Sequence, residues 1–250
     1  IYLKVMKIGA IIEARMSSTR LPGKVLFSVK NKTMLELIIN RIKLVRKIDK
    51  KIIATTTNLN DDKLVKWCKS KKINFYRGSE HNVLNRVYLA AKKYKLDIIV
   101  LITGDCPLVD HNIISQVLLT YLNNKADYVS NAHIRTYPDG MDVQVFNFKS
   151  LKKSHSLAKS NLEKEHVTLN MRRNPKIFKP IYIMAPENLH LPYLGLTLDE
   201  TKDFILIKKI VDYFHTKKNN KFTCDDIINF LKKNPKLMEI NSSVKRKGDT

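Results

Sequence analysis

Glycine is scarce in this chain, with 7 residues among 250, and there are only 8 prolines. Collagen-like, linker-like and low-complexity proteins need glycine or proline in quantity, so the composition excludes those classes. In a glycine-poor chain, a glycine is expected where a tight turn or a close backbone approach requires one. Five of the seven lie in or beside the segments that carry the candidate site residues, namely Gly23, Gly78, Gly104, Gly140 and Gly195.

Cysteine is rarer still, with Cys68, Cys106 and Cys224 and no CxxC pair. This odd number without metal-ligand spacing indicates neither a disulfide framework nor a zinc site, and it fits a reducing compartment. No apolar run approaches the ~18 residues of a membrane-spanning helix. The charged residues Glu13 and Arg15 also occur before any signal-peptide cleavage-site pattern. We therefore expect a cytoplasmic protein with no membrane partner.

Acidic residues are few relative to basic ones. The chain has 46 Lys and Arg residues and 23 Asp and Glu residues, which gives a net charge of +23. A charge of this size raises nucleic-acid binding as one hypothesis. Aromatic residues do not alternate with the basic ones, as they do in proteins that stack single-stranded bases. The lysines instead form short runs along the predicted helices, which is typical of solvated helix faces. We expect no nucleic-acid partner, and steeply salt-sensitive binding of mixed-sequence RNA or DNA would contradict this expectation.

Apolar runs of strand length alternate with segments of helical period through the first half of the chain. The predicted strands cover 7–13, 51–55, 73–76, 97–103 and 127–130, and the predicted helices cover 34–45, 61–71, 83–94 and 111–123. This alternation predicts an α/β fold in which helices cover both faces of a mostly parallel sheet.

The second half of the chain is less regular. We expect an extended segment at 137–148, a helical segment at 151–172 with a break near Ser160, a strand at 177–183, and helices at 200–215 and 223–233. No internal repeat and no long linker divides the chain, so we expect a single domain over residues 1–240. The lysine-rich residues 241–250 are expected to form a frayed basic tail.

The loop EARMSSTRLPGK, residues 13–24, follows the first predicted strand. Three cations, Arg15, Arg20 and Lys24, surround small hydroxyl residues and a Pro-Gly turn there. Cations neutralise phosphate oxygens, hydroxyl and backbone N–H groups donate to them, and small residues let the backbone approach. Ligands of open parallel sheets bind at the carboxyl ends of the strands, where this loop lies. The alternative is an ordinary basic loop, since Walker and dinucleotide-turn spacings are both absent.

A second candidate segment, GDCP, occupies residues 104–107 after a strongly apolar predicted strand. Its Asp105 directly follows Gly104 and precedes Pro107, a proline that makes the turn rigid. A lone carboxylate there suits Mg²⁺, which takes one or two carboxylates together with phosphate oxygens and water. An alternative role for Asp105 is to cap the following helix, although Asp110 is better placed for that. Cys106 has no histidine in a partner position, so we expect it to be a small buried residue that packs in the core and not a nucleophile.

The two segments together resemble the cytidylyltransferases that activate acidic sugars, the CMP-Kdo and CMP-sialic acid synthetases. The run AR-x-x-S-T-R-L-P-G-K and the later GD-x-P carry this resemblance. A closer likeness is to the branch related to the spore-coat polysaccharide synthesis proteins, and it covers roughly residues 7–215. That branch is similar at RGSEHNVLNR (77–86), TGDCPLVD (103–110), YPDGMDVQVF (137–146), EHVT (165–168) and LTLDETKDF (196–204).

The resemblance implies a Rossmann-like, doubly wound, three-layer α/β/α fold of the nucleotide-diphospho-sugar transferase type. The nucleotide-binding half would cover about 1–130, and the half that binds the acceptor and serves dimerisation about 131–240. The implied activity is transfer of CMP from CTP to an acidic sugar, a sialic acid-like or Kdo-like 2-keto acid, with Mg²⁺ as cofactor and pyrophosphate as product. Such a homodimeric enzyme would supply an activated sugar for surface polysaccharide or glycan synthesis.

The resemblance also implies roles for individual residues, of which Arg15, Lys24 and Asp105 would be catalytic. Contacts with the nucleotide would come from Ala14, Arg15, Met16, Ser18, Arg20, Lys24, Arg77, Gly78 and Ser79. The acceptor would meet Asp139, Gly140, Asp142 and Gln144. Asp105 and Asp199 would bind the metal, with Asp203 as the alternative to Asp199. The related branch usually carries Glu where this chain has Gln144, so the resemblance implies no carboxylate role at that position. The segment between Lys149 and Pro192 matches the sialic acid and Kdo enzymes weakly, so the resemblance does not identify the acceptor.

Other functions stay open at this level. A nucleotidyltransferase of this kind can use another nucleotide such as GTP with a sugar 1-phosphate, because base choice depends on backbone contacts that the sequence does not reveal. A metal-dependent glycosyltransferase on the same fold usually carries D-x-D after the fourth strand, and Gly104-Asp105-Cys106 disfavours it. A basic nucleic-acid-binding protein has only the net charge in its support.

Overall fold

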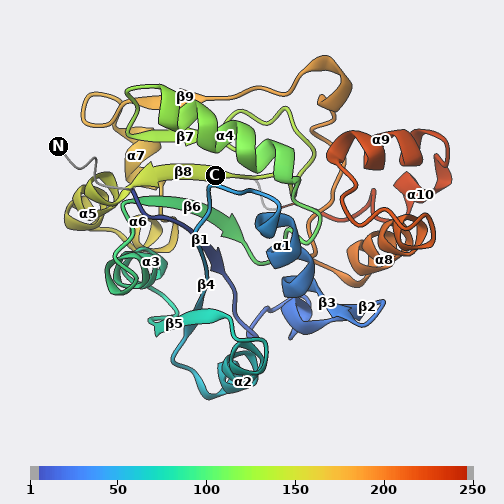
Figure 1. The fold of residues 1–250 in the computed structure, drawn as a ribbon, viewed down its shortest axis with the longest axis horizontal. Coiled ribbons are helices and arrows are strands. Elements are labelled where there is room, and N and C mark those ends of the chain that lie inside the picture. The colour runs from blue at the N-terminus through green and yellow to red at the C-terminus, as the bar shows by residue number, and fades with distance from the viewer. Residues whose placement is uncertain (1–5, 247–250) are drawn as a thin grey trace.

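The computed structural model describes residues 6–246, and a seven-stranded sheet forms its centre (Figure 1). The strand order is β5-β4-β1-β6-β8-β7-β9. The strands are β1 (Ile8–Glu13), β4 (Lys50–Thr56), β5 (Asn74–Gly78), β6 (Ile98–Thr103), β7 (Tyr128–Ser130), β8 (Gln144–Asn147) and β9 (Pro180–Tyr182). Within this seven-stranded sheet of the described chain, β8 alone runs antiparallel to both of its neighbours. The predicted α/β fold with a mostly parallel sheet is confirmed.

Helices cover both faces of this sheet. One face packs against α1 (Met34–Lys43), α2 (Asp62–Ser70) and α4 (His111–Asn123), and the same core extends to α8 (Thr201–Thr216) and α9 (Cys224–Lys232). The other face packs against α3 (Val83–Lys93), α5 (Phe148–Leu157) and α7 (Leu169–Arg173). In β1, Ala10 and Ile12 face the first core and Ile11 faces the second, because successive strand residues point to opposite faces. Both faces are buried, which explains the uninterrupted apolar runs of β1 and β6.

Shorter elements complete the described chain. They are the hairpin of β2 (Ser28–Val29) and β3 (Lys32–Thr33), the helices α6 (Asn161–Glu165) and α10 (Lys236–Glu239), and 3₁₀ turns at Lys24–Leu26, Leu59–Asp61 and Glu187–Leu189. In Figure 1, α8, α9 and α10 gather beside the sheet as an orange and red group. No helix between residues 6 and 246 combines the length and apolar character needed to cross a membrane.

The register of the central strands brings the candidate loops together. Glu13, the last residue of β1, lies opposite Ala54 of β4 and Thr103 of β6. The loops that follow these parallel strands therefore leave from the same edge of the sheet, the edge at which open α/β sheets bind ligands. Asp110 caps α4, because its Oδ1 accepts a hydrogen bond from the Asn112 amide at 2.7 Å. Asp105 is thus not needed as the helix cap.

The second half differs from the expectations in its details. Within the predicted extended segment 137–148, only Gln144–Asn147 forms a sheet strand. The predicted helix at 151–172 is divided into α5, α6 and α7, and the first break falls at 158–160, as expected near Ser160. The predicted strand at 177–183 is reduced to β9, at the edge of the sheet.

The end of the described chain is ordered, and the expectation of a frayed tail from residue 241 is wrong as far as residue 246. Asn241 and Val244 are 4% and 7% exposed. The Arg246 guanidinium donates to Asp203 Oδ1 at 2.7 Å. Buried hydrogen-bond partners hold this segment, whereas lysine content alone predicted solvation. Residues 247–250 of the expected tail lie outside the described residues.

Candidate active site

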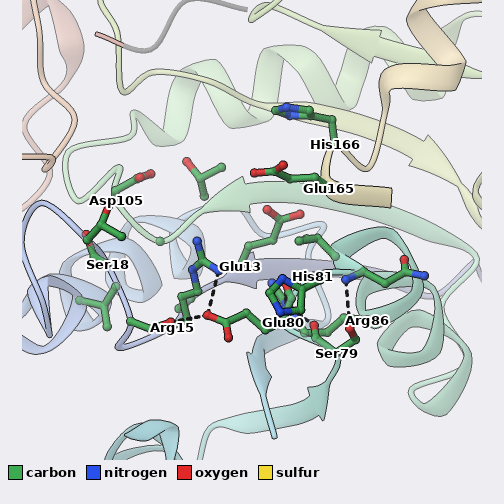
Figure 2. A pocket seen from close by; sticks show the side chains of 18 of the residues that line it. Glu13, Arg15, Ser18, Ser79, Glu80, His81, Arg86, Asp105, Glu165 and His166 are labelled. Atoms are coloured by element: carbon green, nitrogen blue, oxygen red, sulfur yellow. Dashed lines mark hydrogen bonds and ion pairs between the residues drawn. The ribbon is translucent and has the colours of Figure 1, made fainter. Parts of the chain in front are cut away.

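A cavity of about 1010 Å³, here called the main cavity, lies at the carboxyl ends of β1, β5 and β6 (Figure 2). It is lined by the loop after β1, the segment that follows β5, the GD turn after β6, and residues around the end of α6. The residues predicted from the sequence that line it are Ala14, Arg15, Ser18, Arg20, Lys24, Ser79, Asp105 and Asp199. The fold thus brings together segments almost two hundred residues apart in the chain.

Lys24 lies between the two carboxylates predicted to bind a metal. Its Nζ donates to Asp105 Oδ2 at 3.2 Å and to Asp199 Oδ1 at 3.0 Å, and the lysine side chain is only 10% exposed. Arg20 Nη2 lies 2.9 Å from Asp199 Oδ1 as well. Burial lowers the pKa of Lys24, but Asp105 and Asp199 outweigh it and raise this pKa above its ordinary value. The ammonium group therefore stays charged and, together with Arg20, balances the charge of the two carboxylates.

This donor set fits Mg²⁺. Asp105 and Asp199 both contact the Lys24 ammonium group, which is a compact cation, and both line the main cavity. Within residues 6–246, no group of three or more His, Cys, Asp or Glu side chains gathers in a way that could hold a metal. Mg²⁺ commonly binds through one or two carboxylates and completes its shell with phosphate oxygens and water. A pair of aspartates beside a large cavity that arginine and lysine side chains also line matches that mode.

Asp61, which the sequence analysis did not single out, anchors the loop after β1. Its Oδ1 accepts from the Met16 amide at 2.7 Å. Its Oδ2 accepts from Thr55 Oγ1 at 2.8 Å and from the Thr56 amide at 2.9 Å. Burial raises the pKa of Asp61, but these hydrogen bonds outweigh it and hold the pKa below its ordinary value. An ionised carboxylate, 1% exposed, therefore fixes the loop at Met16.

Glu80 holds the same loop from the segment after β5. Its carboxylate accepts from Arg15 Nη1 at 3.0 Å, Ser17 Oγ at 2.6 Å and Asn58 Nδ2 at 2.5 Å. The Arg15 side chain is 45% exposed and faces the main cavity, as Figure 2 shows. Because the ion pair is partly solvated, it contributes little to stability, and a phosphate can exchange with Glu80 as the partner of Arg15.

A second hollow of about 190 Å³, here called the side hollow, adjoins the main cavity. The two share Glu13, Thr103, Glu165 and His166 as lining residues. Two residues predicted to contact the acceptor, Asp142 and Gln144, line the side hollow. The Gln144 amide oxygen accepts from Tyr128 Oη at 3.0 Å and from Thr168 Oγ1 at 2.5 Å, so protein partners orient it. The basic side chains lining this hollow are His133, Arg135, His166 and Arg172.

Glu13 stands where the two spaces meet, and sequence reasoning missed it as a site residue. Its Oε1 is buried without a hydrogen-bond partner among the described residues. Burial raises the pKa of Glu13 to about 7, Arg86 opposes this rise, and Asp105 adds to it. In Figure 2, Glu13 lies between Glu165 on one side and the group of Ser79, Glu80 and Arg86 on the other. A carboxylate at the last position of a buried strand was the signal available in the sequence.

We expect Glu13→Gln to remove a pH-dependent destabilisation of the metal-free protein. The folded-state pKa of about 7 exceeds the ordinary 4.5, so the protonated carboxyl favours folding. This contribution is complete below about pH 4.5 and is lost as the pH rises through 7. At about 1.4 kcal/mol per pKa unit, the upper bound is about 3 kcal/mol.

Urea unfolding of both proteins in EDTA at pH 5 and pH 8 measures this effect. The wild type should lose more stability between the two pH values than the Gln variant, because the amide does not ionise. Other titrating groups are common to both proteins and cancel in the comparison. Equal losses in the two proteins would contradict the assignment to Glu13.

Some predicted residues do not reach the main cavity. Arg77 turns back onto the chain, where its Nε donates to the Thr56 carbonyl at 2.8 Å and its Nη1 to Asp62 Oδ1 at 2.6 Å. Met16 and Gly78 also lie outside the lining of that cavity. A side chain at Gly78 would press against Arg86, so this glycine serves packing between β5 and α3. The donors of Arg77 are thus engaged by the end of β4 and the start of α2.

The predicted acceptor residues are divided in the same way. Asp139 and Gly140 lie outside the lining of both spaces. Gly140 has φ of 105°, and a Cβ there would overlap the backbone at Leu196 and Thr197, so this turn needs glycine. The carboxylate of Asp203 accepts from the amides of Asp199 and Glu200 at 2.9 Å, at the start of α8. Of the two aspartates considered for the metal, Asp199 is therefore the one at the cavity.

Comparison with known proteins gives concordant matches over most of the chain. The family model described as cytidylyltransferase matches residues 9–247. An uncharacterized protein of Methanocaldococcus jannaschii, MJ1063, is 40% identical over 97% of both chains. The spore coat polysaccharide biosynthesis protein SpsF of Bacillus subtilis is 31% identical over 90% of this chain and 94% of its own. A 3-deoxy-manno-octulosonate cytidylyltransferase of Solibacter usitatus is 37% identical over 45% of this chain and 44% of its own.

Solved structures agree with this fold. A cytidylyltransferase from Leptospira borgpetersenii superposes with a TM-score of 0.88 at 31% identity, covering 97% of this chain and 100% of that one. A CMP:2-keto-3-deoxy-manno-octonic acid synthetase complexed with CTP has a TM-score of 0.62 at 15% identity, covering 83% of this chain and 99% of that one. The second likeness bears on the fold alone.

Proposed function

We propose that this chain, which belongs to the cytidylyltransferase family, transfers CMP from CTP to an acidic sugar and releases pyrophosphate. The acceptor would be a Kdo-like or sialic acid-like 2-keto acid. The observation that carries the proposal is the Lys24–Asp105–Asp199 cluster in a large cavity that continues into the side hollow. Family membership favours nucleotidyl transfer over the glycosyltransferase and nucleic-acid-binding alternatives.

Two observations support an acidic sugar as the acceptor. The relatives include a protein named for spore coat polysaccharide biosynthesis and a 3-deoxy-manno-octulosonate cytidylyltransferase. The side hollow also carries Arg135 and Arg172 together with two histidines. Guanidinium groups pair well with carboxylates, often through two hydrogen bonds. The carboxylate of the sugar would lie there, and its reacting hydroxyl would point toward the main cavity.

The main cavity would bind the triphosphate. Asp105 and Asp199 would hold Mg²⁺, which when bound neutralises phosphate charge and lowers the pKa of a coordinated hydroxyl. Arg15, Arg20 and Lys24 would stabilise the charge that develops on the leaving pyrophosphate. Little covalent chemistry is required of the protein in such a transfer, so positioning and charge neutralisation supply most of the rate.

The acceptor hydroxyl must lose a proton as its oxygen bonds to the α-phosphorus, and Glu13 would receive it. The unpartnered Oε1 of Glu13 lies at the junction of the two spaces, where acceptor and nucleotide would meet. Its pKa of about 7 lies near a neutral working pH, which suits a general base. Glu13 would then carry the proton while pyrophosphate departs.

A pyrophosphate-release screen tests the proposed function. CTP, GTP, UTP and ATP are each combined with Mg²⁺ and with acidic eight- and nine-carbon sugars or sugar 1-phosphates. We expect release with CTP and an acidic sugar. Turnover confined to another nucleotide and a sugar 1-phosphate would replace the substrate assignment, and no turnover with any pair would contradict the proposal. The homodimer, the cytoplasmic location and the supply of sugar for polysaccharide synthesis stay predictions.

A further inference from the structure

Residues 241–246, here called the C-terminal strap, pack against the segment that carries Asp199. Asn241 Nδ2 donates to the Gly195 carbonyl at 2.9 Å and to Asp203 Oδ1 at 2.7 Å. Arg20 Nη1 donates to the Lys245 carbonyl at 3.2 Å. The strap is thus tied both to the Gly195–Asp203 segment and to the loop after β1, although it begins some forty residues beyond Asp199.

Arg246 is the charged residue of the strap that faces the carboxylates. Its Nη2 donates to Asp203 Oδ1 at 2.7 Å and its Nη1 to Thr197 Oγ1 at 3.0 Å. Its Nη1 also lies 3.9 Å from Asp199 Oδ2, and its Nε lies 3.8 Å from Asp139 Oδ2. One guanidinium group therefore forms charge pairs with three carboxylates. The Arg246 side chain is 20% exposed and those of the three aspartates are 15% exposed or less, so solvent screening is limited.

Gly195 provides the surface on which the guanidinium lies. A Cβ at Gly195 would overlap Arg246 Nη2, Cζ and Nε. The backbone of Gly195 is outside the left-handed region, so the backbone itself tolerates alanine. The same residue pairs with Asp139 in a β-bridge, supported by hydrogen bonds from the Asp139 amide to the Leu194 carbonyl and from the Leu196 amide to the Asp139 carbonyl. Arg246 thus covers the junction of two segments that lead into the site.

We propose that Arg246 is a positioning residue that holds Asp199 in place for the metal and fixes the Asp139 turn beside it. Arg246 lies outside the lining of both spaces, so it acts through these aspartates and does not touch substrate. Without the guanidinium, Asp139, Asp199 and Asp203 would face one another with less compensation, and only Arg20 and Lys24 would hold the Asp199 carboxylate. The proposal rests on the proposed function insofar as Asp199 is taken as a metal ligand.

Two substitutions far apart in the sequence should produce the same defect. Arg246→Ala removes the guanidinium, and Gly195→Ala displaces it by filling its place. Each should raise the Mg²⁺ concentration for half-maximal pyrophosphate release about tenfold, the range found for residues that orient metal ligands. The maximal rate at saturating Mg²⁺ should change much less. The double variant should be no worse than Arg246→Ala, because the added methyl group then meets no guanidinium.

A second readout is independent of turnover. Binding of Mn²⁺ to the CTP-loaded protein, followed by electron paramagnetic resonance, should weaken in both single variants by a similar factor. If the wild type binds Mn²⁺ but shows no turnover, the proposed function fails while the role of Arg246 is still measured. Lys245→Ala is the matched control, because it removes one positive charge from an exposed side chain of the strap and should leave both readouts unchanged.

Two further observations guard against a purely structural explanation. Arg246→Lys keeps the charge without the planar fork and should give an intermediate shift. The thermal midpoint of each variant shows whether it is folded. If Arg246→Ala unfolds, the two single variants Gly195→Ala and Arg246→Lys are compared with the wild type instead. Strictly additive effects of Gly195→Ala and Arg246→Ala, or unchanged metal dependence in the folded variants, would overturn the proposal.

Discussion

Asp105→Asn is expected to lower the turnover number by on the order of 10³-fold, since it removes a charge that metal-assisted phosphoryl chemistry requires. The substitution is nearly isosteric. The Asp105 carbonyl accepts from the Leu198 amide at 2.8 Å, so the backbone of the turn stays tied to the segment that carries Asp199. The Asn oxygen can still accept from Lys24. The fold should therefore persist while the metal ligand is lost.

Pyrophosphate release over a series of Mg²⁺ concentrations measures this loss, and circular dichroism checks the fold. Asp62→Asn is the matched control, because Asp62 pairs with Arg77 outside the main cavity and is 44% exposed. The control should keep nearly full activity. Undiminished turnover of Asp105→Asn would remove Asp105 from the metal site and would contradict the proposed mechanism.

Lys24→Met is expected to destabilise the metal-free protein by about 2 kcal/mol and to abolish activity. Removing one partner of a buried charge pair costs ~3–5 kcal/mol, and the partial exposure of Asp105 reduces this cost. Asp105 is 30% exposed and Asp199 is 15% exposed. In the variant their mutual repulsion would be compensated only by the arginines nearby. Methionine keeps most of the aliphatic volume, so the loss reports on the charge.

Mg²⁺ should stabilise the Lys24→Met variant more than the wild type, because the ion can replace the missing cation between the two carboxylates. Urea unfolding in EDTA and in excess Mg²⁺ gives the two differences. Activity should not return with Mg²⁺, since the leaving pyrophosphate still lacks Lys24. Lys30→Met, which removes a surface partner of Asp212 at 3.7 Å, should change stability by less than ~0.5 kcal/mol. Equal stability of Lys24→Met and wild type in EDTA would contradict this assignment.

Much of the fold could be predicted from local pattern. The predicted helix at 111–123 coincides with α4, and the strands predicted at 7–13 and 97–103 differ from β1 and β6 by one residue. In α4 the apolar residues recur at helical spacing, whereas β1 and β6 are uninterrupted apolar runs of strand length, and both patterns are strong local signals. The resemblance to cytidylyltransferases, read from the first loop and the GD turn, is confirmed by the family match over residues 9–247.

The placement of β8 could not be predicted in the same way. Only four residues, Gln144–Asn147, form this strand, and they insert antiparallel between β6 and β7. Pairing partners of a short strand are set by packing against distant segments, so the local pattern indicates an extended segment without its neighbours. This insertion brings Gln144 beside Tyr128 and into the side hollow.

The sequence by itself determined the alternating α/β order, the basic loop after the first strand and the carboxylate after a later one, because each is written in contiguous residues. Only the tertiary structure decided which charges meet. Lys24 reaches two aspartates, Glu13 becomes a buried carboxyl between two spaces, and Arg246 returns from the end of the described chain to three aspartates. The strength of an ion pair and the pKa of a side chain depend on burial and on neighbours in space. Neither burial nor spatial neighbours can be read from the spacing of residues along the chain.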